Sequence, residues 1–433
     1  MFGYYLDLAL RSLKRNRVLT ALMVVAIALG IGASMTTLTV LHVLSGDPLP
    51  GSSTTLFNPR IDPFSMDGYE PDKPPPEQVT WTDGMNLLHA ARADRQALMT
   101  GGAVPIQPTL SSLDPFYTDA RYTTADFFSM FSVPFLYGRG WNASDDDGKA
   151  RVVVISKLLN EKLFEGKDST GQTLRMKDTS FQIVGVLGDW HVNPHFYDLN
   201  IGDYAEAEDV FMPLTTSRDM KLPLNGSTDC WGTGGDPEHA ENTPCVWLQF
   251  WVQITDPAKV EAYKTYLIHY SQEQKTLGRF ERPPNVALLN VMQWLDFKKV
   301  VPSDVRLQTW LALGFLLVCL VNTVGLMLAK FLRRSAELGV RRALGASRRD
   351  VFMQLLIEAG VIGLAGGVGG LLLAYTGLWL VRREPSSYAS LAHLDVTMLL
   401  FTFVLALIST ICAGLLPAWR ACQITPALQL KSQ

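Results

Sequence analysis

Four long apolar runs constrain the fold of this chain of 433 residues more than any other feature. A helix rises about 1.5 Å per residue, so roughly 20 apolar residues cross the hydrocarbon core of a bilayer, which is about 30 Å thick. Each run reaches that length. The glycines of the first run lie in its middle, between Ala28 and Ala33, where they suit close helix packing rather than the cleavage site of a signal peptide. The predicted transmembrane helices are residues 18–44, 308–330, 354–381 and 396–416.

The basic residues around these runs predict the orientation, because cytoplasmic loops retain Lys and Arg. They are concentrated before the first run and between the second and third runs, whereas the loop of residues 382–395 carries only Arg382 and Arg383. We therefore expect residues 45–307 and 382–395 to lie outside the cytoplasm. The predicted cytoplasmic segments, which include both termini, are residues 1–17, 331–353 and 417–433.

The segment of residues 45–307 is long enough to bury one or two cores of its own. It opens with a connector rich in Pro, Gly and Ser at residues 46–76. Short β-branched runs then alternate with helical patterns, as in Val152–Ile155 followed by Lys157–Phe164. This alternation predicts an α+β domain. The expected fold is a mixed membrane protein with four transmembrane α-helices and a large α+β extracytoplasmic domain between the first and second helices.

Two of the five cysteines lie in this outside segment. Cys230 and Cys245 flank a loop rich in Gly, Pro and Asp. Because an oxidising compartment favours disulfides and closing a loop of this size contributes roughly 3 kcal/mol, we predict a disulfide between them, with two unpaired thiols as the alternative. Cys319, Cys412 and Cys422 lie in or beside apolar runs, where a thiol behaves as a small hydrophobe.

Sequence signatures of enzymatic chemistry are few. No Gly-x-x-x-x-Gly-Lys-Ser/Thr motif occurs, so we expect this chain to bind no nucleotide or other cofactor and to be no enzyme. Asp189, His191 and His195 could ligate zinc, but the intervening proline and the lack of a further Cys or His nearby favour a hydrogen-bonded loop, and no metal site is expected. Acidic residues outnumber basic ones in the outside segment, which does not favour nucleic acid as a partner.

Two polar side chains lie within predicted transmembrane helices. Glu358 is the only charge of the third run, and because a carboxylate facing lipid is costly, we expect it near the cytoplasmic interface or against another helix. A packing role and a part in coupling both stay open for it. We expect Asn322, in the second run, to make an interhelical hydrogen bond rather than to bind substrate.

The connection between the second and third runs is the most informative segment. It is strongly basic and contains Gly339 and Gly345, which allow a break in a helix or the close approach of another backbone. Physical chemistry alone gives equal weight to two interpretations. The segment is either a turn that presses on a soluble partner or a basic loop that sets the topology and meets anionic lipid.

The residues of this segment resemble a known family. The run Glu337–Val351, followed by Glu358-Ala359-Gly360 at the start of an apolar helix, resembles the permease signature of MacB/FtsX-type ABC transporters. Short motifs of the outside segment are similar to those of MacB-like periplasmic core domains and occur in the same order. They are residues 124–128, 138–140, 153–156, 163–166, 171–174 and 183–186. Together the similarities span essentially the whole chain.

The resemblance implies how the chain assembles. It implies a dimer of four-helix subunits, identical or homologous, in the bacterial inner membrane, with the outside domain in the periplasm. Each subunit contacts a separate ABC ATPase, which binds the ATP and Mg²⁺. A periplasmic adaptor and an outer-membrane channel are further candidate partners beside membrane lipid. The residues assigned to ATPase coupling are Glu337, Leu338, Gly339, Arg341, Arg342, Ala343, Leu344, Gly345 and Ala346.

The expected function follows from that assembly. We predict a permease subunit that transmits ATP-driven motion to its periplasmic domain for efflux of a small molecule, peptide or lipid-like substrate, without the substrate crossing the bilayer. The alternative is an ATP-driven regulator of a periplasmic or signalling partner, with no export. The sequence does not identify the substrate, because ligand preference depends on the surface of the assembled domains.

Overall fold

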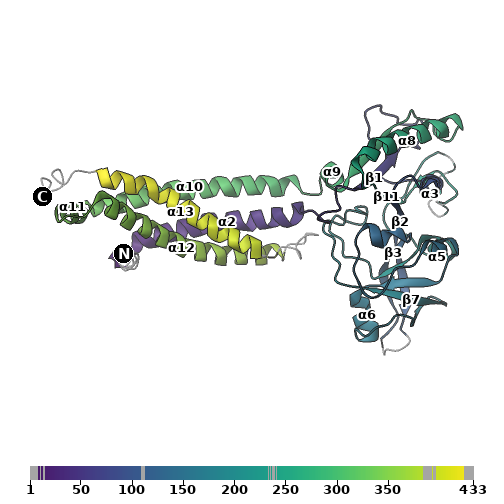
Figure 1. Cartoon of the computed structure of the whole chain (residues 1–433), viewed down its shortest axis with the longest axis horizontal. Helices are drawn as coiled ribbons and strands as arrows, with labels where there is room; N and C mark the ends of the chain where they lie inside the picture. The colour runs from purple at the N-terminus through teal and green to yellow at the C-terminus, as the bar shows by residue number, and fades with distance from the viewer. Residues whose placement is uncertain are drawn as a thin grey trace. The chain divides into compact units, whose positions relative to one another are not determined.

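The computed structural model describes residues 8–9, 11–12, 15–108, 113–232, 234, 236, 239, 241–383, 393 and 396–423. The chain forms two compact units (Figure 1). One unit consists of Met1–Ser45 and Val301–Gln433, and the other is Gly46–Val300. In chain order the second unit is therefore inserted between two stretches of the first.

The first unit contains the helices that cross the membrane. Four of its described helices are long and apolar enough to do so. They run side by side in Figure 1 and are α2 (Arg17–Ser45), α10 (Ser303–Arg333), α12 (Arg348–Val381) and α13 (Val396–Gln423). The prediction of four transmembrane helices, with a mixed α/β domain between the first and second, is confirmed.

Glycines bring α12 and α2 into close contact. A Cβ atom added at Gly366 of α12 would lie 2.5 Å from Ile27 Cγ2, and one added at Gly370 would lie 2.8 Å from Ile31 Cγ2. Conversely, a Cβ atom added at Gly32 of α2 would lie 2.6 Å from the Cβ atom of Leu373 on α12. A larger residue at these positions would require neighbouring atoms to shift, and such close contacts are how membrane helices gain van der Waals attraction.

A mixed sheet forms the core of the second unit. Among the described residues ten strands join in one sheet, in the order β12-β1-β11-β2-β3-β8-β5-β7-β4, with β6 beside β2 and β7. The β3–β8 and β5–β7 pairs are parallel and the other pairs are antiparallel. The strands are β1 (Leu56–Ile61), β2 (Arg95–Gln107), β3 (Phe116–Thr123), β4 (Phe135–Gly138), β5 (Val152–Ile155), β6 (Thr173–Met176), β7 (Thr179–Leu187), β8 (Val210–Pro213), β11 (Gln249–Gln253) and β12 (Val286–Asn290).

Helices and a short hairpin complete the second unit. Strands β9 (Asp229–Cys230) and β10 (Cys245–Val246) pair with each other apart from the main sheet. The longest helix begins at a polar cap, since Asp256 accepts the backbone N–H of Ala258 and Pro257 occupies the first turn. The helices are α3 (Trp81–Ala90), α4 (Asp126–Met130), α5 (Ala143–Asp147), α6 (Lys157–Phe164), α7 (Leu214–Asp219), α8 (Pro257–Thr276) and α9 (Val291–Phe297).

The contact between α2 and α12 predicts opposite effects for two glycines of one helix. Gly366→Ala should lower the free energy of unfolding by about 1–3 kcal/mol, because the added methyl group meets Ile27. Gly360→Ala adds the same methyl group where no atom lies within 4 Å, and it should leave stability unchanged or raise it by up to about 1 kcal/mol. Thermal unfolding in mild detergent measures both, and equal melting temperatures would contradict the close contact.

Candidate coupling site

The basic connection between α10 and α12 forms a short helix followed by a tight turn. Helix α11 (Ser335–Ala343) contains the predicted coupling residues from 337 to 343, and those from 344 to 346 form the turn. Gly345 has a φ of +104°, a backbone conformation that L side chains rarely adopt. Ser347 then caps α12, because its hydroxyl accepts the backbone N–H of Asp350 and the Asp350 carboxylate accepts the backbone N–H of Ser347.

Two apolar side chains project from this segment into solvent. Leu344 is 83% exposed, the highest value among the large hydrophobic side chains that the structure describes. Val340 is 52% exposed and lies four residues earlier, on the same side of the helix. These two side chains add little to the core of this chain, and their apolar surface is available to a partner.

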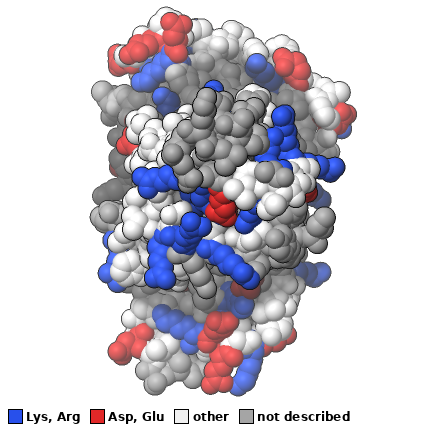
Figure 2. Space-filling model, turned by 90° about the vertical axis from the view of Figure 1, so that its left-hand side faces the viewer, with Lys and Arg blue, Asp and Glu red and all other residues white. Residues whose placement is uncertain are grey.

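Arginines are numerous in and beside the segment that carries this apolar pair. Figure 2 looks onto the end of the molecule that carries α11, where Lys and Arg side chains gather around few acidic ones. The described arginines in and beside the connection are Arg15, Arg17, Arg333, Arg334, Arg341, Arg342, Arg348 and Arg349. Such a face attracts anionic headgroups and acidic protein surfaces.

Glu358 is buried at the end of the helices next to α11 and is paired with cations. Its carboxylate lies 2.6 Å from Lys330 Nζ and 3.3 Å from Arg334 Nη1, and it accepts a hydrogen bond from the Ser12 hydroxyl. The side chains of Lys330 and Glu358 are both 0% exposed. Because removal of one partner leaves a buried charge uncompensated, each member of this pair depends on the other.

Further contacts join this buried pair to α11. Arg334 lies 3.4 Å from the Glu337 carboxylate, which lies 3.1 Å from Arg341. Arg341 in turn donates a hydrogen bond of 3.0 Å to the side chain of Gln354, one helical turn before Glu358 on α12. The contacts therefore close into a ring that joins the end of α10, helix α11 and the start of α12. We call Arg334, Glu337, Arg341, Gln354 and Glu358 the coupling ring.

The charge of Glu337 is maintained by its neighbours. Burial acts to raise the pKa of Glu337, but the hydrogen bond and charge of Arg334, with the charges of Arg341 and Arg15, outweigh it, so the pKa lies below its ordinary value. Arg15, which precedes α2, approaches the same carboxylate to 3.3 Å. Glu337 is thus ionised at neutral pH and holds arginines from three segments.

Glu358 lies against another helix, α10, as expected from the free-energy cost of a carboxylate that faces lipid. Lys330 and Ser12, neither of which is a predicted site residue, are both partners of Glu358. A signal for Lys330 exists in the sequence, because it is the first cation after a long uncharged run, as Glu358 is the only carboxylate of the next one. The partnership with Ser12 has no such signal.

Asn322 lies on an exposed face of α10. No hydrogen bond of its side chain to another described residue is found. Two glycines lie one and two turns away on the same helix, and a Cβ atom added at Gly314 or Gly325 would have no atom within 4 Å. The interhelical hydrogen bond predicted for Asn322 is therefore not found among the described residues.

Cys230 and Cys245, the predicted pair, are joined by a disulfide between β9 and β10.

The candidate zinc ligands have separate partners. Asp189 pairs with Lys157 at 2.9 Å, whereas His195 is buried 3.5 Å from Glu208. Within the described part of the chain no three His, Cys, Asp or Glu side chains gather as a metal site.

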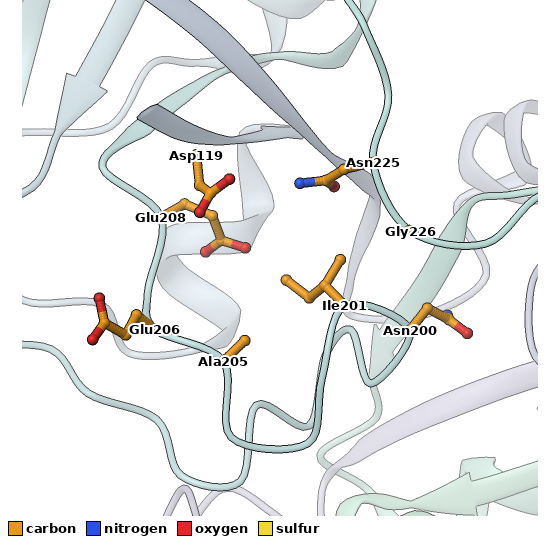
Figure 3. Close-up of a pocket in the computed structure, with 8 residues that line it drawn as sticks. All are labelled: Asp119, Asn200, Ile201, Ala205, Glu206, Glu208, Asn225 and Gly226. Atoms are coloured by element: carbon orange, nitrogen blue, oxygen red, sulfur yellow. The ribbon is translucent and has the colours of Figure 1, made fainter. Parts of the chain in front are cut away.

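A polar cavity of about 420 Å³ lies in the second unit and has no counterpart in the sequence predictions. Figure 3 shows that its wall carries the carboxylates of Asp119, Glu206 and Glu208. Burial, Glu208 and Asp209 raise the pKa of Asp119. The remaining lining residues are Asn200, Ile201, Ala205, Asn225 and Gly226.

Glu208 also belongs to a buried network that the chain itself satisfies. Arg121 donates to Glu208, with Nε at 2.9 Å, and lies 2.6 Å from Asp198. The Tyr197 hydroxyl donates to the second oxygen of Glu208 at 2.8 Å. This carboxylate is therefore committed to the fold rather than free to bind a ligand.

His195 makes the stability of this network depend on pH. Burial lowers the pKa of His195, opposed by Glu208 and reinforced by Arg121. Between the folded-state pKa and the ordinary value of about 6.5, the unfolded chain binds a proton that the folded chain does not, so His195 costs stability as the pH falls. On acidification from about pH 7 to 5, His195→Gln should lose less stability than the wild type, by up to about 1.4 kcal/mol per pH unit. Melting curves at both pH values measure this, and parallel losses would contradict it.

The buried pair of Lys330 and Glu358 predicts strong coupling between two substitutions. Lys330→Met alone should lower the free energy of unfolding by about 3–5 kcal/mol, because the Glu358 carboxylate stays buried without its nearest cation. Adding Glu358→Met should restore much of that loss. A double-mutant cycle from unfolding in detergent measures the coupling, and additive effects would show that the pair is not formed.

Two family profiles match the chain. The MacB-like periplasmic core domain matches residues 20–270, and the FtsX-like permease C-terminal region matches residues 310–426. The pyoverdine export ATP-binding/permease protein PvdT of Pseudomonas aeruginosa is 22% identical over 422 residues, covering 96% of this chain and 57% of its own length. The macrolide export ATP-binding/permease protein MacB of Escherichia coli is 23% identical over 437 residues, covering 98% of this chain and 60% of its own length.

The chain thus spans only part of the length of these relatives. The crystal structure of the periplasmic region of MacB from Actinobacillus actinomycetemcomitans aligns with a TM-score of 0.37 and 12% identity, over 59% of this chain and 97% of that one. The profile of the periplasmic core domain alone covers more than half of the chain. With four apolar helices and both profiles in order, the chain belongs to the MacB/FtsX family of export-type ABC transporter permeases, which are multi-pass inner-membrane proteins with a periplasmic domain.

Proposed function

We propose that this chain is the membrane subunit of an export machine and transmits ATP-driven motion of a separate ABC ATPase to its periplasmic domain. The observation that carries the proposal is the exposed pair of Leu344 and Val340, held at the end of a basic segment by the coupling ring. An exposed apolar side chain that is held in one position can fill a pocket of a partner protein.

The partner has to supply the nucleotide chemistry. These 433 residues contain no phosphate-binding loop, and we propose that ATP and Mg²⁺ bind to the partner ATPase rather than to this chain. Both curated relatives are named ATP-binding/permease proteins, which supports an ATPase at this end of the machine. The coupling residues proposed are those of α11 and its turn, with Leu344 as the centre of the contact.

The orientation follows from two independent features. The arginines around α11 favour the cytoplasmic side for this end and for both termini. The disulfide between Cys230 and Cys245 favours an oxidising compartment for the inserted unit, as the periplasm provides. Motion that begins at α11 then reaches α2 and α10, the two helices that continue in the chain into Gly46–Val300.

The exposed face of α10 supports a second permease chain as a partner. Gly314, Val318, Val321 and Gly325 recur at intervals of three or four residues and form one stripe, with Asn322 beside it. Val318 is 56% exposed and Val321 is 62% exposed. The glycines would admit another helix closely, and the amide of Asn322 would gain the hydrogen bond that it lacks within the described chain.

We propose export rather than regulation because the relatives are named for the export of pyoverdine and of macrolides. The substrate class is a small molecule, peptide or lipid-like compound. A periplasmic adaptor and an outer-membrane channel would complete the route, and the basic face would rest on anionic lipid. An ATP-driven regulator of a periplasmic partner is the second candidate.

Leu344→Asp tests the ATPase contact. We expect recovery of an ATPase with the tagged chain to fall about tenfold or more, because loss of a central apolar anchor costs at least about 1.4 kcal/mol. Purification from native membranes in mild detergent, followed by identification of proteins that contain a phosphate-binding loop, measures this. The control Leu158→Asp changes a side chain that is 66% exposed in the inserted unit and should leave recovery unchanged. Absence of any ATPase from the wild type, or equal recovery with Leu344→Asp, would overturn the proposal.

A further inference from the structure

We propose that the coupling ring, with Lys330, is the element that makes α2 and α10 follow α11, so that its members are positioning residues for ATP-driven transmission. This inference rests on the proposed function, since it assigns the path of a motion that an ATPase begins. Of the coupling residues it concerns Glu337 and Arg341, whose polar groups pair within the ring, and not Val340 and Leu344, the exposed side chains proposed to meet the ATPase.

The outer half of the ring attaches α11 to its two neighbours. Glu337 lies 3.4 Å from Arg334 at the end of α10, and Arg341 donates to Gln354 on α12 at 3.0 Å. Because Glu337 and Arg341 also pair with each other at 3.1 Å, the two attachments cannot shift independently. A displacement of α11 therefore acts on both helices at once.

The inner half of the ring connects α11 to α2 and α10, the helices that continue into the inserted unit. Glu358 holds Lys330 and Arg334, both supplied by the last turns of α10. The Lys330 ammonium group also donates to the Thr20 hydroxyl of α2 at 3.5 Å. Lys330 is thus the point at which α2, α10 and α12 meet in polar contact, and α2 and α10 are the helices that continue into the inserted unit.

Because the inner contacts are buried, they do not loosen gradually but are either formed or broken. With Lys330 and Glu358 both 0% exposed, water does not replace a broken contact, so partial separation leaves charges uncompensated. Groups in such a site keep one arrangement or change to another as a whole, which is the property that transmission requires.

Stability alone does not account for the outer contacts. The side chains of Glu337 and Arg341 are both 32% exposed, and ion pairs in contact with water contribute little to folding. The buried pair would fix the helix ends without them. What the outer contacts add is a connection between the segment that carries Leu344 and the buried pair.

Hydrogen–deuterium exchange on the purified complex of this chain with its ATPase tests the inference. Exchange is compared with and without Mg²⁺ and a non-hydrolysable ATP analogue in two regions, residues 335–347 of α11 and its turn, and residues 303–310 at the far end of α10. Glu337→Gln and Arg341→Gln open the ring where it is partly exposed, so they should fold normally. The control Arg420→Gln removes an exposed cation of α13 outside the ring.

In the wild type and the control, the nucleotide should change exchange in both regions. In Glu337→Gln and Arg341→Gln, the change at residues 335–347 should persist while the change at residues 303–310 is lost, a separation that a purely structural role would not produce. Transmission to residues 303–310 in these variants, or loss of both responses, would overturn the inference. A wild type that responds only at residues 335–347 would also overturn it. A wild type with no response at residues 335–347 would instead contradict the proposed ATPase contact.

Discussion

A carboxylate buried away from water is costly unless cations or hydrogen-bond donors are held against it. Glu358 of α12 meets this requirement with groups that come from elsewhere: Lys330 and Arg334 from α10, and Ser12 from the segment before α2. These segments cannot separate without exposing an unpaired charge to an apolar environment. The rest of this end of the helices is arranged from this point outward, since α11 is attached through Arg334 and the exposed Leu344 follows α11.

Two kinds of contact hold the helices together, and they occur at different places along the helices. Along the apolar length of α2 and α12, the glycines at 32, 366 and 370 bring backbones together and the attraction is dispersion at short range. At the end next to α11 the contacts are ionic and depend on charge rather than shape. Lipid offers helices no hydrophobic reason to associate, so the bundle relies on both.

The sequence predicts well what depends on local pattern. Length and hydropathy are enough for the four helices, and basic flanks are enough for a proposed orientation. Strand β2 is not predicted, because it is buried on most of both faces and Gly101-Gly102 interrupt its apolar residues, so it lacks the alternation of a half-buried strand. The partnership of Ser12 with Glu358 and the polar cavity are not predicted for another reason. The residues that form them are far apart in the chain, and only the packed fold brings them together.

The edge of the large sheet has a consequence for how such a chain is built. Strand β12 is the edge strand and pairs antiparallel with β1, so that Phe57 near the entry of the inserted unit lies opposite Asn290 near its exit. A domain whose two ends are neighbours can be placed between consecutive helices without stretching either connection. The inserted unit is in this sense a cassette. Another domain with equally close ends could be inserted between the same helices, so the inserted unit can change while the membrane part is kept.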